Sequence, residues 1–180
     1  LIGDGAFRCC KMLQEVTIPA SVIKLDIYAF QHCINLTGVH FDDGLQIIGA
    51  GAFYECKALQ DLTLPSSVTK LGRRAFQGCS NLTEVNLNDG LELIGDGAFH
   101  GCRALKQVTI PASVTKLGRR AFQGCSNLTE VNLNDGLELI GDGAFRCCKM
   151  LQEVTIPASV TKLGRRAVGH LCIPTLQQPG

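Results

Sequence analysis

Cysteine is the residue type with the most obvious chemical potential in this 180-residue chain, which contains ten of them. Cysteines bind zinc when they come in close pairs such as C-x-x-C, and in secreted proteins they form disulfides. Seven of them recur instead once every 23 residues: Cys10, Cys33, Cys56, Cys79, Cys102, Cys125 and Cys148. Each follows a phenylalanine by three residues and precedes a leucine by three, so the spacing predicts a buried ladder of packed thiols and no metal site. Disulfides between repeats remain the alternative.

Three cysteines fall outside this ladder. Cys9 and Cys147 each stand beside a ladder cysteine, at a position where other repeats carry glycine, and Cys172 lies near the end of the chain. Because that position does not belong to the apolar set, we expect Cys9 and Cys147 to be partly exposed free thiols.

Catalytic groupings are not indicated by the spacing. The four histidines, His32, His40, His100 and His170, lie in different repeats or at different positions within them, and none is placed with a nucleophile and a carboxylate. The Gly-Asp-Gly sequences beginning at Gly3, Gly95 and Gly141 lack the Lys-Ser/Thr sequel of a phosphate-binding loop. We therefore expect a protein that is not an enzyme and has no cofactor.

The 23-residue repeat predicts the architecture. The segment from Gly72 to Phe99 recurs letter for letter from Gly118 to Phe145, and alternate repeats turn through Pro-x-Ser-Val or through Asp-Gly-Leu. Such a period is typical of solenoids, in which each repeat, here called a rung, covers the apolar face of the next. The pattern predicts a solenoid of about seven rungs over residues 1–167, with 168–180 as an irregular tail or cap.

Within a rung, two elements are expected. Ala75, Cys79 and Leu82 have the i, i+4, i+7 spacing of a short helical turn. Val85 and Leu87 then alternate with polar residues, which predicts a half-buried strand here and at the equivalent place of every rung.

The unit from Ile94 to Leu117, Ile-Gly-x-x-Ala-Phe-x-x-Cys-x-x-Leu-x-x-Val-x-Ile-Pro-x-Ser-Val-x-x-Leu, resembles the BspA-like class of leucine-rich repeats. The resemblance covers residues 1 to about 167. It implies an α/β fold, a right-handed solenoid with a parallel β-sheet on the concave face and short helical or 3₁₀ turns on the convex face. It also implies surface or secreted proteins that take part in adhesion and partner binding.

Charge and hydropathy exclude two kinds of partner. Seventeen basic and sixteen acidic residues give a net charge of +1, so bulk attraction to nucleic acid is not expected. No apolar run approaches the roughly 18 to 20 residues that span a bilayer, so direct membrane insertion is not expected either. Unpaired cysteines favour a reducing compartment and the resemblance favours the outside; we lean to a secreted or cell-surface location.

One charged column has two interpretations. Arg73, Asp96, Arg119, Asp142 and Arg165 occupy the same position of successive rungs, so opposite charges alternate along the stack and favour its order. Alternatively, the Arg-Arg pairs that begin at Arg73, Arg119 and Arg165 form an anion-binding patch.

The outward positions of the predicted strands are the candidate binding surface, a polar and mildly acidic sheet. Its candidate partner-binding residues are Glu15, His40, Asp61, Glu84, Asn86, Lys106, Thr109, Glu130, Asn132, Glu153 and Thr155. One interpretation is that these are simply solvated strand faces. The other is a non-catalytic interaction or adhesion module that presents a repetitive surface to a protein or glycan partner. A structural scaffold or filament that assembles end to end through uncapped rungs is the competing hypothesis.

Overall fold

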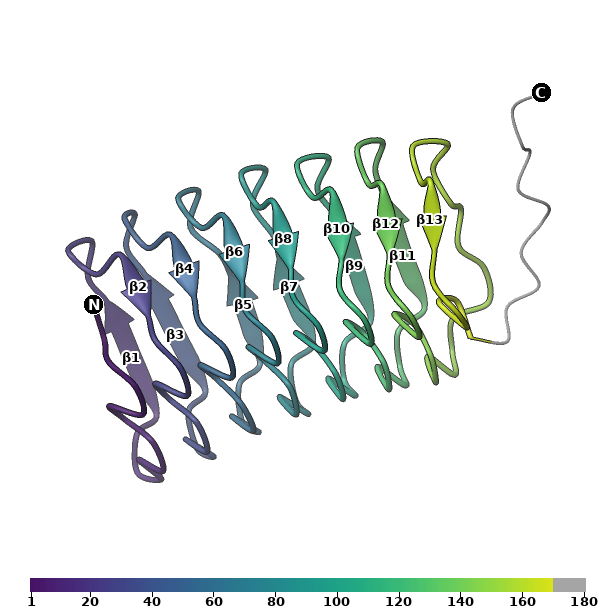
Figure 1. The fold of residues 1–180 in the computed structure, drawn as a ribbon. Helices are drawn as coiled ribbons and strands as arrows, with labels where there is room; N and C mark the ends of the chain where they lie inside the picture. The colour runs from purple at the N-terminus through teal and green to yellow at the C-terminus, as the bar shows by residue number, and fades with distance from the viewer. Residues whose placement is uncertain (170–180) are drawn as a thin grey trace.

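The chain winds into a parallel β-solenoid whose rungs stack along one axis (Figure 1). The structure is a computed structural model that describes residues 1–169. One side carries a parallel sheet of seven two-residue strands, in the order β13-β12-β10-β8-β6-β4-β2. These strands are β2 (Lys24–Leu25), β4 (Ile47–Ile48), β6 (Lys70–Leu71), β8 (Leu93–Ile94), β10 (Lys116–Leu117), β12 (Leu139–Ile140) and β13 (Lys162–Leu163).

A second side carries longer strands, whose outward residues alternate with buried ones as the sequence predicts. They are β1 (Glu15–Ile18), β3 (Gly38–Phe41), β5 (Asp61–Thr63), β7 (Glu84–Asn86), β9 (Gln107–Ile110) and β11 (Glu130–Leu133). Where two of these strands pair, each residue lies opposite the residue 23 places away, as Leu62 does with Val85 and Val108 with Val131. The rungs therefore stack in phase.

The long strands pair only two by two, as β1-β3, β5-β7 and β9-β11. In the first pair, the Asp42 N–H donates to the Ile18 carbonyl at 2.9 Å just past the strand ends. The equivalent residues of the third, fifth and seventh rungs are Pro65, Pro111 and Pro157. Proline has no N–H, so this bond cannot form toward the rung before it, and pairing stops there.

The same break explains one wrong prediction. The sequence predicts a long strand in the seventh rung, yet residues 152–156, which include Glu153 and Thr155, form no strand. They precede Pro157, so they lack the last ladder bond toward β11.

The predicted helical turns are absent: none of residues 1–169 is helical. Arg74, just before the expected turn, and Gly78, within it, both have left-handed backbone angles, with φ of 57° and 78°. N–H groups therefore alternate in direction. Gln77 donates within its own rung to Arg74 at 3.1 Å, whereas the Phe76 N–H donates to Ala98 of the next rung at 2.7 Å. A helix needs successive right-handed residues whose N–H groups all point one way, so this corner is a series of tight turns.

The core is built from the phenylalanine and cysteine columns. Rings of successive rungs, from Phe7 to Phe145, stack with centroids 4.9 to 5.6 Å apart. Each ladder thiol from Cys33 to Cys148 donates to the carbonyl of the phenylalanine 26 residues earlier, at 3.0 to 3.3 Å. Cysteine thus supplies a small apolar volume and a weak donor at once. The packed thiol ladder is confirmed, and the nine cysteines of the described part are all free.

The C-terminal end continues the stack up to the limit of the described residues. The Phe145 N–H donates to the Ala167 carbonyl at 2.6 Å, and Val168 is buried. The rest of the expected tail, with His170 and Cys172, lies outside the described residues. Among residues 1–169 we find no helix of the length and apolarity needed to cross a bilayer.

Candidate interaction surface

The outer face of the long strands holds the candidate residues predicted from sequence. We define the long-strand face as strands β1, β3, β5, β7, β9 and β11, the residue that directly precedes each strand, the equivalent residues 152–156, and the turn that follows each. All eleven candidates are exposed. Eight of them lie in the long strands, Lys106 directly precedes β9, and Glu153 and Thr155 lie in the segment without a strand.

Polar side chains on this face are tied to one another. The Asn86 amide donates to Glu84 Oε1 at 3.0 Å and to Thr63 Oγ1 of the neighbouring strand at 3.3 Å. The Asn132 amide donates to Glu130 Oε1 at 2.8 Å. These bonds orient the two exposed glutamate side chains.

The long-strand face carries more acidic residues than the mildly acidic sheet predicted from the sequence. Nine of the sixteen acidic residues lie on the long-strand face, namely Glu15, Asp42, Asp43, Asp61, Glu84, Asp89, Glu130, Asp135 and Glu153. Of the seventeen basic residues, Lys106 alone lies there. The fold therefore sorts a nearly neutral composition into one acidic face and a basic remainder.

Two hollows open on this face where the strand pairing is broken. One of about 480 Å³ lies between β3 and β5 and is lined by Asp42, Asp43 and Asp61 together with His40 and Thr63. The other, of about 240 Å³, lies between β7 and β9, where Glu84, Asn86 and Asp89 face Gln107 and Thr109. Sequence reasoning missed Asp42, Asp43 and Asp89 as surface residues. The available signal was their place in the Asp-Gly turn that follows each such strand.

In the alternating charge column, the aspartate side chains bond mainly to backbone N–H groups of the arginines in the next rung. Asp96 Oδ1 accepts the Arg119 N–H at 2.8 Å, and Asp142 Oδ1 accepts the Arg165 N–H at 2.8 Å. One side-chain ion pair of the column forms within residues 1–169, between Arg119 Nε and Asp96 at 3.3 Å. Because both side chains are largely exposed, such a pair is worth about 0 to 1 kcal/mol.

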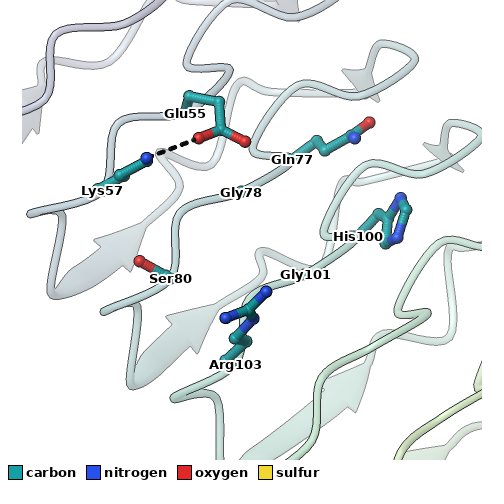
Figure 2. A pocket seen from close by; sticks show the side chains of 8 residues that line it. All are labelled: Glu55, Lys57, Gln77, Gly78, Ser80, His100, Gly101 and Arg103. Atoms are coloured by element: carbon teal, nitrogen blue, oxygen red, sulfur yellow. Dashed lines mark ion pairs between the residues drawn. The ribbon is translucent and has the colours of Figure 1, made fainter.

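The opposite corner, built from the tight turns around the phenylalanines, is basic. Figure 2 shows one of its hollows, of about 300 Å³, where Lys57 and Arg103 lie across a glycine floor from Gln77 and His100. An adjoining hollow of about 290 Å³ around His100 is lined by four arginines and two carboxylates, namely Arg73, Arg74, Arg119, Arg120, Asp96 and Asp142. Sequence reasoning considered the arginine pairs as a patch but had no reason to place His100 among them.

Within residues 1–169, no group of three or more histidine, cysteine, aspartate or glutamate side chains is arranged to hold a metal ion. His32, His40 and His100 lie on different strands or turns.

The repeating rung, the in-phase parallel strands and the internal phenylalanine stack define a leucine-rich-repeat solenoid. A family model described as "BspA type Leucine rich repeat region (6 copies)" matches residues 1–128 and 47–173, so the chain belongs to this family.

Solved structures agree with this assignment. A leucine-rich repeat protein from Bacteroides ovatus superposes with a TM-score of 0.88 at 30% identity, over 99% of this chain and 47% of that chain. A T. pallidum leucine-rich repeat protein gives 0.79 at 33% identity, over 84% of this chain and 71% of that one. A leucine rich cell surface protein from Faecalibacterium prausnitzii gives 0.76 at 36% identity, over 84% and 43%. The chain thus spans about half the length of the first and third of these. No curated protein sequence matches it.

Proposed function

We propose that this protein is a non-catalytic interaction module that binds a partner protein carrying basic groups through its long-strand face. The observation that carries the proposal is the sorting of charge: nine carboxylates and one lysine on that face, with the remaining basic residues elsewhere. A face of one sign attracts a partner of the opposite sign and orients it during encounter.

The expected binding mode is many weak equivalent contacts. Glu84 and Glu130 lie two rungs apart within segments of identical sequence. An exposed ion pair contributes only about 0.2 to 1 kcal/mol, but several made by one partner add through effective concentration. The binding should therefore weaken strongly with salt, because the Debye length is about 10 Å at 0.1 M ionic strength.

A secreted or cell-surface location is part of this proposal. The F. prausnitzii relative is described as a leucine rich cell surface protein. The many cysteines, which favour a reducing compartment, do not stand against it: the ladder thiols from Cys33 to Cys148 are buried and bonded to carbonyls, where oxidants and other thiols cannot reach them.

The test uses two double variants that differ only in the face they change. Glu84→Lys with Glu130→Lys reverses two charges of the long-strand face. Glu92→Lys with Glu138→Lys makes the same change in the same two rungs, at exposed positions just before the short strands β8 and β12.

Binding of a fluorescent dodecapeptide of alternating lysine and serine is measured by anisotropy. We expect the first variant to lose about tenfold or more in affinity and the second to stay within about threefold of the unaltered protein. Equal losses in the two variants would mean that only total charge matters, and unchanged binding by the first variant would remove the proposed face.

A further inference from the structure

One column of the basic corner alternates between arginine and glycine. It contains Arg74, Gly97, Arg120, Gly143 and Arg166, so successive rungs carry arginine and glycine in turn at this position. All five have left-handed backbone angles, with φ between 52° and 64°. The missing side chain at each glycine leaves a notch between two arginines.

The notch at Gly97 is shaped by its neighbours. A methyl group placed there would lie 3.6 Å from Arg74 Cγ and 3.7 Å from His100 Cβ, in ordinary contact with both. The notch at Gly143 is built alike, with Arg120 Cγ at 3.8 Å and Arg146 Cβ at 3.6 Å. The feature therefore recurs every 46 residues along the corner.

Positive charge around the Gly97 notch is only partly neutralised. Four arginines line the hollow against two carboxylates, Asp96 and Asp142, and Asp96 is paired with Arg119 at 3.3 Å. Within residues 1–169, the guanidinium groups of Arg74 and Arg120 make no ion pair and no side-chain hydrogen bond. Burial, then Arg120 and Arg74, lower the pKa of His100 below its usual range, as expected in a positive field.

The Gly97 notch belongs to the hollow of about 290 Å³, and the hollow of Figure 2 extends this surface. The two hollows share Gln77 and His100, and Gly78 and Gly101 give the hollow of Figure 2 a floor without side chains. On its far side, Lys57 is paired with Glu55 at 3.4 Å, whereas Arg103 makes no ion pair within the described part of the chain. A continuous path thus runs from Arg120 past His100 to Arg103.

We propose that the two hollows form one binding site for the sulfate groups of an extended sulfated polysaccharide. Guanidinium groups present forked donors that match a tetrahedral oxyanion. The backbones of Arg74 and Arg120 are two rungs apart, roughly 10 Å at the usual spacing of parallel strands. The basic lining continues to Arg103 in the adjoining hollow, and a polymer with charges at intervals can contact this whole path at once. Nucleic acid fits less well, because no tyrosine, phenylalanine or tryptophan lines either hollow for base stacking.

The test separates loss of the site from loss of the fold. Arg74→Gly with Arg120→Gly removes both guanidinium groups at positions whose left-handed backbone suits glycine, so the fold is retained or stabilised. The control, Lys70→Ala with Lys116→Ala, removes the same charge from the same two rungs on strands β6 and β10.

Binding of a heparin octasaccharide is measured by titration calorimetry, with Tm recorded for each variant. We expect the arginine variant to lose about tenfold or more in affinity without a lower Tm, and the control to remain within about twofold. A chemically desulfated octasaccharide should not bind. Unchanged affinity in the arginine variant, equal loss in the control, or tighter binding of a single-stranded oligonucleotide than of the heparin octasaccharide would each overturn the assignment.

Discussion

Several residues in the tight turns around the phenylalanines have a backbone conformation that favours glycine. Among residues 1–169, the residues other than glycine with left-handed angles are Cys9, Tyr28, His32, Glu55, Arg74, Arg120, Cys147 and Arg166. Other rungs have glycine at the same two positions. A side chain there costs about 1 to 2 kcal/mol relative to glycine, so these residues do not stabilise the backbone turns that they occupy.

Substituting Arg120 by glycine should raise the free energy of unfolding by about 1 kcal/mol, because glycine adopts the left-handed angle without the steric cost of a Cβ. Urea denaturation measures the change. Arg119→Gly is the matched control; its backbone is not left-handed, and glycine should lower the stability there by about 0.5 to 1 kcal/mol. Destabilisation of similar size at both positions would show that backbone strain at Arg120 is absent.

Thiol reactivity should divide the cysteines into two groups. Cys9 is exposed and Cys147 half-buried, whereas Cys79, Cys102 and Cys125 are fully buried. Burial raises the pKa of these three thiols well above the ordinary value, and that of Cys148 to about 12, so the reactive thiolate is scarce.

Cys10, in the first rung, is also half-buried, so it is replaced together with Cys172. In this Cys10→Ser, Cys172→Ser background, a bulky aromatic disulfide reagent should modify the folded protein in a fast phase that Cys9→Ser with Cys147→Ser abolishes. Absorbance of the released thiolate follows the reaction. A fast phase that survives the double substitution would mean that ladder thiols are accessible.

At the scale of elements, proline sets the pairing of the long strands. Replacing Pro111 by alanine supplies the missing N–H opposite the Leu87 carbonyl, and should join β7 to β9. The added hydrogen bond, about 0.5 to 1.5 kcal/mol, is offset by the greater freedom of the unfolded chain, about 0.4 to 1 kcal/mol. Overall stability should consequently change little.

Amide hydrogen exchange at residue 111 is the direct readout. The new amide should exchange slowly, and Pro65→Ala should behave likewise between β3 and β5. Exchange as fast as in an exposed turn at both positions would contradict the account of the broken sheet.

The long strands, the short strands and the tight turns differ in how well the local sequence pattern predicts them. The alternation around Val85 correctly predicts a strand, because outward and inward side chains follow a period of two. A two-residue strand such as Leu93–Ile94 shows no period, so the seven-stranded sheet was not predicted. The helical spacing of Ala75, Cys79 and Leu82 is real, but the left-handed angle at Arg74 comes from pairing with the next rung and has no signature in an arginine.

The candidate surface was also predictable only in part, because the sequence shows strand alternation but not which strands pair. The exposed columns follow directly from strand alternation, so Glu84 and Glu130 could be named from sequence. The hollows could not, because they depend on which neighbouring strands fail to pair. The prolines were visible in the sequence, but only as turn residues.

At the scale of the whole molecule, the net charge of +1 conceals a separation of charge across the solenoid. A 23-residue period places the same position of every rung on the same side, so a modest bias at a few positions becomes an acidic face and a basic corner. Two surfaces of opposite sign can engage two different partners at once, which suits a module that joins a basic protein to a sulfated polymer.

The proposed binding of a basic partner to the long-strand face can be located by photo-crosslinking. The lysine-serine dodecapeptide is crosslinked to the protein, and the modified residues are identified by mass spectrometry. The identical rungs are no obstacle, because only the position within the rung needs to be known. The account predicts crosslinks on strands β5 to β11 and in the turns that contain Asp43 and Asp89. Crosslinks concentrated in the arginine corner or on the seven-stranded sheet would contradict it.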